Sequence, residues 1–323
     1  MKKYVSQFIK SRNLLLVCIC VVFFVNQTAY GQKSFQCQNN SDIKISLQSF
    51  SFNKLLNNYA KGGDNGMSVY ELLEFSAENN FDAIDILSYF FPGYPEIPED
   101  EVIYEIKKRA FHLGLEISGT GVRSDFANID PNIRAESVIH VKQWIDVAVK
   151  LGVPLVRIFS GNIPKGYEGK WDEIAVYTAA SIKECVNYGK ERGVLIGVQN
   201  HGGFLKTAEE TIKLVKMVNS DYFGVIVDTG YFLTEDPYSD MKMVMPYAFS
   251  FLLKESPIPN NTSVKIDLIK IKNILLESDF RGYVQIETLS PKNSPKKSSY
   301  DPYKVVPVFL KEVRTAIIDV CKK

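Results

Sequence analysis

The sequence predicts an α/β fold in which eight parallel strands alternate with helices and close into a (β/α)₈ TIM barrel. Eight short apolar segments rich in β-branched and aromatic residues recur along the chain, and segments with helical spacing lie between them. Strands that alternate with helices favour a parallel sheet, and eight units of this size fit a barrel. No change of composition and no linker separates a second domain.

The apolar segments define the expected strands, and the segments with 3.6-residue periodicity define the expected helices. The strands are expected at 43–52, 83–87, 115–118, 155–160, 194–199, 222–227, 250–253 and 283–286. The helices are expected at 69–79, 101–113, 135–151, 175–192, 208–218, 266–278 and 302–321.

Glycines end several of the expected helices just before the next strand begins. Gly114, Gly152 and Gly193 each follow a predicted helix and precede an apolar residue, and glycine at this place adopts the left-handed conformation that closes a helix. No Gly-x-Gly-x-x-Gly follows the first strand. We therefore expect no nucleotide cofactor, and an open α/β sheet is the alternative to the barrel.

Residues 1–31 have the pattern of a secretory signal peptide, which leaves the barrel at 32–323. Four basic residues, the last at Arg12, precede an apolar run at 14–25, and Ala29 and Gly31 stand at −3 and −1 of the expected cleavage site. Because a membrane span needs about 20 apolar residues, we expect cleavage and a periplasmic or secreted protein with no stable membrane span. An uncleaved anchor is the alternative.

The charge balance excludes a chain that attracts nucleic acid through its overall field. The sequence has 38 basic and 37 acidic residues, and removal of residues 1–31 leaves 34 and 37, which gives no net positive field. Cys37, Cys185 and Cys321 remain, enough for one disulfide, and none lies beside a histidine. The sequence does not define an oligomeric state.

Polar and charged residues stand where the expected strands end. In a TIM barrel, these ends and the loops that follow them carry the active site. Because charged side chains are rarely buried without partners, their repetition at one end of the barrel predicts a shared pocket. From the first strand to the eighth the residues are Gln48, Asp85, Tyr89, Arg123, Asp125, Arg157, Ser160, Gln199, Asn200, His201, Asp228, Lys254 and Glu287.

Several of these residues also have a purely structural interpretation. Asp228 has the residue type of a cap for the following segment, and Lys254 that of an ion-pair partner for Asp228 or Glu287. The alternative for His201 is a hydrogen bond within its glycine-rich loop. For Arg123 and Arg157, the alternative to substrate contact is a salt bridge at the barrel rim.

Several segments together resemble the xylose-isomerase-like sugar phosphate isomerase/epimerase superfamily. They are 199–203 (QNHGG), 228–230 (DTG), 251–255 (FLLKE) and 282–289 (GYVQIETL), while 89–94 (YFFPGY) and 157–161 (RIFSG) resemble its exported branch. The resemblance covers nearly all of residues 32–323. It implies a TIM barrel, a sugar or polyol substrate and, in many members, a divalent metal.

The resemblance also implies where a metal would bind. Members with a complete site use Glu, Asp, His and Glu from strands five to eight. Asp228 and Glu287 match this quartet, Gln199 replaces its first Glu, and we assign Leu252 to its His position. Because an amide oxygen ligates hard cations and leucine does not, Mn²⁺ or Mg²⁺ on Asp228, Glu287 and Gln199 is one alternative, and a site without metal is the other.

The remaining residues suggest one-base chemistry. Epimerisation in this superfamily uses two carboxylates, and the amide of Gln199 cannot accept a proton at neutral pH. We expect Glu287 as the base, with Lys254, or a metal held by Asp228, stabilising the oxyanion. His201 would move a proton to or from oxygen.

The expected partner is a small carbohydrate, non-phosphorylated or oxidised, because phosphorylated sugars are scarce outside the cytoplasm. The candidate substrate-binding residues are Gln48, Tyr89, Arg123, Arg157, Asn200 and Tyr231. The expected reaction is isomerisation or epimerisation by proton abstraction next to a sugar carbonyl. Two alternatives stay open: a lyase or hydrolase of keto-glycosides, and a sugar-binding protein without catalysis. Gln199 and Leu252 favour the second of these, while Asp228, Lys254 and Glu287 oppose it.

Overall fold

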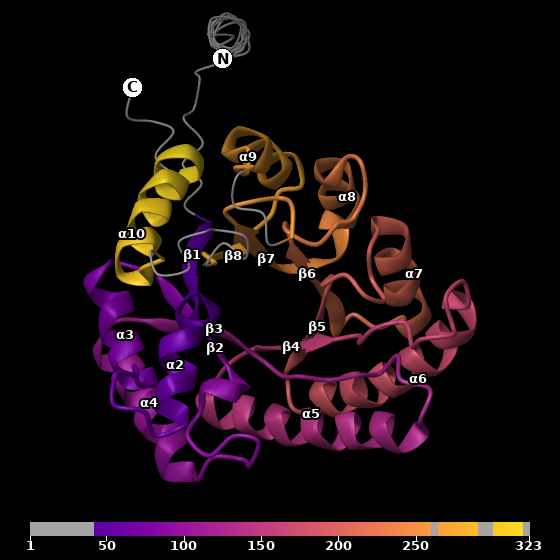
Figure 1. The fold of residues 1–323 in the computed structure, drawn as a ribbon, viewed down its shortest axis with the longest axis horizontal. Coiled ribbons are helices and arrows are strands. Elements are labelled where there is room, and N and C mark those ends of the chain that lie inside the picture. The colour runs from indigo at the N-terminus through magenta and orange to yellow at the C-terminus, as the bar shows by residue number, and fades with distance from the viewer. Residues whose placement is uncertain (1–41, 260–263, 290–299, 319–323) are drawn as a thin grey trace, which may run out of the picture. The chain divides into compact units, whose positions relative to one another are not determined.

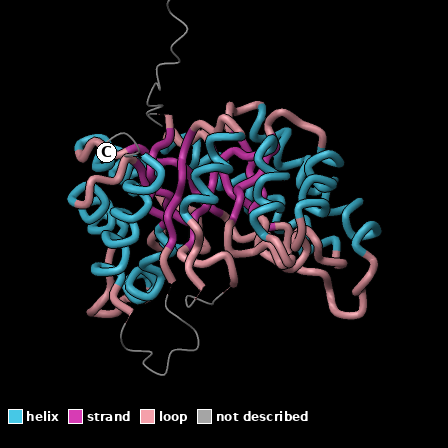
Figure 2. The backbone as a smooth tube through the Cα atoms, turned by 90° about the horizontal axis from the view of Figure 1, so that it is seen from above, coloured by secondary structure: helices cyan, strands magenta, loops and turns pink. Residues whose placement is uncertain are grey.

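The computed structural model describes residues 42–259, 264–289 and 300–318, all within one compact unit. The predicted signal peptide, Cys37 and Cys321 lie outside these residues. Eight parallel strands form a closed barrel in chain order, from β1 next to β2 round to β8 next to β1. Figure 1 shows the helices around this barrel, and Figure 2 shows the strands enclosed between them. The predicted fold is confirmed.

The strands agree closely with the apolar segments of the sequence. Their bounds are β1 Ile43–Gln48, β2 Ala83–Leu87, β3 Glu116–Gly121, β4 Leu155–Phe159, β5 Leu195–Gln199, β6 Phe223–Asp228, β7 Ala248–Lys254 and β8 Gly282–Glu287. The first prediction extended too far, to Phe52. The side chain of Gln48 accepts a hydrogen bond from the Phe50 amide and caps a 3₁₀ turn at Ser49–Phe52, so the apolar alternation of this segment is turn rather than strand.

The helices cover the outside of the barrel. Their bounds are α2 Asn53–Ala60, α3 Val69–Glu78, α4 Asp100–His112, α5 Pro131–Leu151, α6 Trp171–Lys190, α7 Ala208–Val218, α8 Pro237–Val244, α9 Leu268–Glu277 and α10 Pro302–Val313. The sequence did not predict α2 and α8, which have eight residues each. Helices this short have little periodicity and form through tertiary packing.

Two apolar clusters hold the barrel together. The larger one lies between the strands and the helices. The smaller one contains Leu155, Ile226 and Leu252, three strand residues, with Leu195 and Phe249 packed against it. Since side chains two residues apart on a strand share a face, Leu252 lies one layer below Lys254. The small cluster therefore underlies the polar ends of the strands.

No helix within the described part of the chain is both long and apolar enough to cross a membrane.

Candidate functional site

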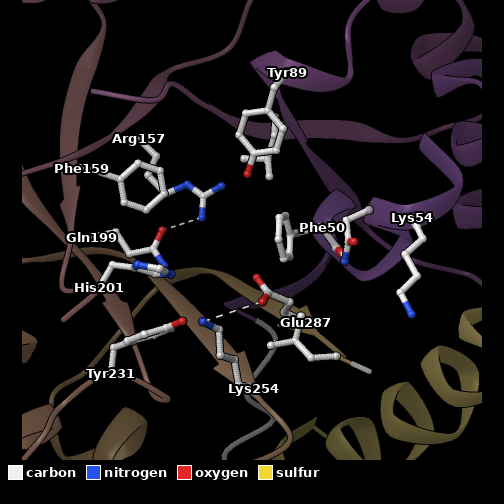
Figure 3. A pocket seen from close by; sticks show the side chains of 13 residues that line it. Phe50, Lys54, Tyr89, Arg157, Phe159, Gln199, His201, Tyr231, Lys254 and Glu287 are labelled. Atoms are coloured by element: carbon white, nitrogen blue, oxygen red, sulfur yellow. Dashed lines mark hydrogen bonds and ion pairs between the residues drawn. The ribbon is translucent and has the colours of Figure 1, made fainter. Parts of the chain in front are cut away.

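A cavity of about 330 Å³ opens where the strands end. Figure 3 shows its side chains converging from strands and loops on opposite sides of the barrel. Seven of the residues predicted from the sequence line it together: Tyr89, Arg157, Gln199, His201, Tyr231, Lys254 and Glu287. The others are Phe50, Asn53, Lys54, Leu87, Phe159 and Leu289.

A buried ion cluster forms the floor of this cavity. Lys254 Nζ lies 2.8 Å from Asp228 Oδ2 and 3.7 Å from Glu287 Oε1. The exposed fractions of these residues are 6% for Lys254, 0% for Asp228 and 4% for Glu287. One ammonium thus lies between two carboxylates at the ends of three adjacent strands, with Glu287 facing the cavity and Asp228 beneath it.

Lys254, two residues after Leu252, ends β7 beside the other charged strand ends. The last residues of β5 to β8 are Gln199, Asp228, Lys254 and Glu287, and Lys254 pairs with Glu287 in the register of β7 and β8. Leu252 belongs to the apolar layer below. The end of β7 therefore contributes an ammonium group, in agreement with the predicted ion pair of Lys254 with Asp228 or Glu287.

Three hydrogen bonds with Gly230 and Asn200 hold Asp228 in place. Its Oδ1 accepts a hydrogen bond from the Gly230 amide at 2.9 Å. The side chain of Asn200 accepts from the Asp228 amide at 2.8 Å and donates to the Asp228 carbonyl at 3.0 Å. Asn200 is fully buried and does not line the cavity, which corrects its predicted contact with substrate. Its geometry is that of a residue that positions Asp228.

Gln48 also lies below the cavity rather than in its wall. Its Nε2 donates to Asp85 Oδ1 at 3.0 Å, and Gln285 Nε2 donates to Asp85 Oδ2 at 3.1 Å. Burial raises the pKa of Asp85, and the nearby charge of Arg157 opposes this rise. Gln48 is fully buried, so the structure corrects its predicted role: it supports Asp85 instead of facing a ligand.

Arg157 supplies unused hydrogen-bond donors to the cavity. Its Nη1 donates to Gln199 Oε1 at 2.7 Å, whereas its buried Nε and Nη2 make no hydrogen bond. Gly121 makes room for the guanidinium, because a Cβ at that position would lie 2.7 Å from Nε. Nη2 lies 3.7 Å from Asp85 Oδ1, too far for a hydrogen bond, and buried donors without hydrogen-bond partners are costly, so the guanidinium keeps an unmet capacity to donate.

The electrostatics of the floor favour a strong base beside a permanent cation. Burial raises the pKa of Glu287, although the charge of Lys254 opposes the rise. Burial lowers the pKa of Lys254, but attraction by Asp228 and Glu287 outweighs it, and the pKa stays above its usual value. Lys254 is therefore protonated at neutral pH, while Glu287 holds a proton more tightly than an exposed glutamate does.

His201 is packed among aromatic rings at the cavity wall. Its ring centroid lies 3.8 Å from that of Tyr231 and 5.2 Å from that of Phe159. Burial and the charge of Lys254 lower the pKa of His201 to about 4. The imidazole is therefore neutral at physiological pH and can both donate and accept one hydrogen bond.

Aromatic rings form much of the wall, and two of them were missed in the sequence. Phe159 ends β4 and Phe50 lies in the turn after β1. Both residues are apolar, so the pattern of polar residues at strand ends does not include them. Their common position after a strand was the available signal, since sugars stack on aromatic faces as readily as they bind polar groups.

A second cavity, of about 310 Å³, adjoins the first and shares Phe159 and His201 with it. Arg123, predicted as a substrate contact, lines this second cavity, and its guanidinium lies 4.4 Å from the centroid of the Tyr89 ring. The loops after β3, β4 and β5 supply the remaining wall: Ser124, Asp125, Ser160, Gly161, Asn162 and Gly202.

The residues present do not fit a divalent metal. Gln199 Nε2 donates to Asp228 Oδ2 while its Oε1 accepts from Arg157. Because a carboxylate only accepts and a guanidinium only donates, both amide ends are engaged. The ammonium of Lys254 occupies the space between Asp228 and Glu287. Among the described residues, no group of three or more His, Cys, Asp or Glu side chains is arranged to hold a metal ion.

Comparison with solved structures gives the same fold. A D-psicose 3-epimerase has a TM-score of 0.68 and 16% identity over 85% of this chain and 99% of its own. A D-psicose 3-epimerase from Clostridium cellulolyticum H10 gives 0.67 and 17% with the same coverage. A 3-keto-D-glucoside 4-epimerase from E. coli gives 0.64 and 11%, again over 85% and 99%.

Comparison with curated proteins finds no match. The family model described as xylose isomerase-like TIM barrel matches residues 73–302, which is more than half of the chain. This match agrees with the closed eight-stranded barrel and with the polar site at its carboxyl end. The chain belongs to the xylose isomerase-like TIM barrel family.

Proposed function

We propose that the protein is a sugar isomerase or epimerase-like enzyme that removes a proton from the carbon next to a sugar carbonyl. The observation that carries the proposal is the buried Glu287 carboxylate, which faces the cavity 3.7 Å from the Lys254 ammonium. The names of the similar solved structures, D-psicose 3-epimerase and 3-keto-D-glucoside 4-epimerase, support this class of reaction.

Each step uses the chain's own residues. Glu287 accepts the proton, and the electrons of the C–H bond move onto the carbonyl oxygen. Lys254 and the unused donors of Arg157 stabilise the resulting enediolate, and neutral His201 transfers a proton between the sugar oxygens. Glu287 then returns its proton to the adjacent carbon. A general base of this kind contributes about 10²–10⁴-fold to the rate.

We propose a non-phosphorylated or oxidised sugar as substrate. The buried cations of the site, Lys254 and Arg157, are already matched by the carboxylates of Asp228, Glu287 and Asp85. No excess of buried positive charge is therefore left for a phosphate. The signal-peptide pattern of residues 1–31 supports export as well. An unprocessed N-terminus on the protein recovered from its host would contradict cleavage of the signal peptide, and recovery of the protein in the cytoplasmic fraction would contradict export.

A keto-glycoside lyase is a second candidate, because the second cavity offers room for a leaving group. In that reaction Glu287 takes the proton next to the carbonyl, a C=C bond forms, and the C–O bond to the leaving group breaks. The released alkoxide then takes the proton that Glu287 removed. Detection of a cleaved alcohol would separate this candidate from isomerisation.

Deuterium exchange tests the proposal directly. D-Fructose, D-psicose, D-tagatose and methyl 3-ketoglucoside are incubated with the enzyme in D₂O, with and without Mn²⁺, and exchange is followed by NMR. We expect exchange by the wild type without added metal and its loss in Glu287→Gln. Glu255→Gln, a carboxylate paired with Lys265 outside both cavities, should retain it.

Two results would overturn the proposal. If Glu287→Gln exchanges as fast as the wild type, Glu287 is not the base. If the wild type binds one of these sugars but exchanges no C–H hydrogen in any of them, the protein is a sugar-binding protein without this activity.

A further inference from the structure

We propose that the substrate extends beyond one sugar ring, and that a second hydroxyl-rich unit binds in the cavity formed by the loops after β3, β4 and β5. This inference rests on the proposed function, because it assigns the reacting ring to the cavity that contains Glu287. The ligand it predicts is an oxidised glycoside whose second unit is a neutral sugar or polyol.

The first argument is that the two cavities are neighbours. They have volumes of about 330 and 310 Å³ and share Phe159 and His201 as common walls. Arg123 lines the second cavity while its guanidinium stacks on Tyr89, which lines the first. A ligand that lies against Phe159 and His201 is therefore in reach of both cavities.

The second argument is an unsatisfied acceptor in the second cavity. Asp125 lines it, and the buried Oδ1 of Asp125 accepts no hydrogen bond, while Oδ2 accepts from Asn128 Nδ2 at 2.9 Å. Gly161, at φ +99°, keeps this region open, since a Cβ there would lie 2.0 Å from Oδ1. A buried carboxylate oxygen without a donor is unfavourable. Because Oδ1 is itself buried, a hydroxyl that enters the second cavity would pair with it after a rotation of the Asp125 side chain.

The two cavities thus contain complementary unpaired groups: hydrogen-bond donors in the first and a hydrogen-bond acceptor in the second. In the first, Arg157 Nε and Nη2 lack acceptors, and in the second, Asp125 Oδ1 lacks a donor. A carbonyl or ring oxygen satisfies the former and a hydroxyl satisfies the latter. The second cavity is lined by one cation and one anion, Arg123 and Asp125, so its lining has no excess charge and favours a neutral hydroxylated group.

The test compares a short and a long ligand of the same chemistry. Binding of methyl 3-ketoglucoside and of 3-ketocellobiose is measured by calorimetry for the wild type, Asp125→Ala and Asn162→Trp. Asn162 is exposed and lines the second cavity, so tryptophan there fills the cavity without disturbing the core. Glu168→Gln, in the same loop but outside both cavities, is the control.

We expect the wild type to bind the disaccharide more tightly than the methyl glycoside. Asp125→Ala should weaken the disaccharide about ten- to hundredfold, the effect of losing a hydrogen bond to a charged group, and leave the methyl glycoside unchanged. Asn162→Trp should act in the same direction, and Glu168→Gln should change neither affinity.

Equal effects of the variants on both ligands, or no effect on either, would overturn the second binding site. Equal binding of the two ligands by the wild type would do the same. None of these results bears on proton abstraction, which the deuterium exchange of the methyl glycoside reports separately. Failure of the wild type to bind either ligand would overturn both the substrate class and the second site.

Discussion

At the scale of single residues, the site depends on how burial and charge act on Glu287, Lys254 and His201. Burial makes Glu287 a stronger base, while Lys254 keeps its own proton because two carboxylates attract it. Desolvation beside its neighbouring rings and the charge of Lys254 keep His201 neutral, although part of its ring is exposed. At neutral pH Lys254 is therefore a cation and His201 a neutral proton carrier, while the raised pKa of Glu287 makes its ionised form a stronger base than an exposed glutamate.

These states predict the pH dependence of the reaction. Because Glu287 must be ionised to accept a proton and its pKa lies above the usual 4.5, kcat/KM should fall as the pH drops through that raised pKa. With its pKa lowered to about 4, His201 should add no transition near its usual 6.5. The pH profiles of the wild type and His201→Asn measure this. A transition near 6.5 that disappears in the variant contradicts the prediction.

Removal of the ammonium should impair catalysis and shift the profile. Without its charge, Lys254→Met should lower kcat by about 10²–10³-fold, the usual effect of losing an oxyanion stabiliser. Loss of an opposite charge also raises the pKa of a carboxylate, so the acidic limb should move to higher pH. Lys265→Met, which removes an exposed ion-pair partner of Glu255, is the control. An unshifted limb in Lys254→Met would mean that the two groups are not coupled.

The polar residues at the ends of the predicted strands identify part of the site but not all of it. This pattern identified the charged floor and most of the polar wall, because those positions follow directly from where strands stop. It misplaced Gln48 and Asn200. Both stand at strand ends, but their amides hydrogen-bond to neighbouring strands, and which neighbour lies beside them depends on barrel register rather than on local sequence.

At the scale of elements, capped helices fix the loops that carry the site. The loop from β5 to α7 contains His201 and ends at Thr207, the N-cap of α7. Thr207 Oγ1 accepts from the Glu210 amide at 3.2 Å, and Glu210 Oε2 accepts from the Thr207 amide at 3.2 Å. This capping box defines where the loop stops and the helix begins.

Loss of this cap should cost stability more than activity. Thr207→Ala removes the hydroxyl acceptor and should lower the free energy of unfolding by about 1 kcal/mol. Thr207→Ser keeps the acceptor and should be near neutral. Urea unfolding of both variants, with kcat measured alongside, checks this. If the serine variant loses as much stability as the alanine variant, packing of the threonine methyl group is responsible instead of the cap.

At the scale of the whole molecule, the closed barrel brings four strand ends into one ring. The sequence spans 88 positions from Gln199 to Glu287, yet these two residues and the two between them, Asp228 and Lys254, end adjacent strands. This ring carries its own positive charge in Lys254. A divalent cation would have to compete with that ammonium for the same carboxylates.

Metal analysis of the wild type and a designed variant test the conclusion that these residues do not fit a divalent metal. The purified wild type should contain no stoichiometric Mn²⁺ or Mg²⁺ by elemental analysis, and its exchange activity should survive chelators. The double variant Gln199→Glu with Lys254→His replaces an amide and an ammonium by two ligands and should gain Mn²⁺ binding by calorimetry. Tight Mn²⁺ binding by the wild type that is lost in Asp228→Asn would contradict the conclusion that the site does not hold a divalent metal.

The sequence by itself determined the order of the strands and helices, a parallel sheet and the polar character of its carboxyl end, and it favoured a closed barrel over an open sheet. These follow from local periodicity and from the rule that strands joined by helices run parallel. Only the tertiary structure decided that Lys254 lies between Asp228 and Glu287, that Gln48 and Asn200 lie below the cavity, that Arg157 and Asp125 leave unmet hydrogen bonds, and that two cavities share a wall. The reason is that register between strands and the packing of loops are set by long-range contacts, which no local pattern encodes.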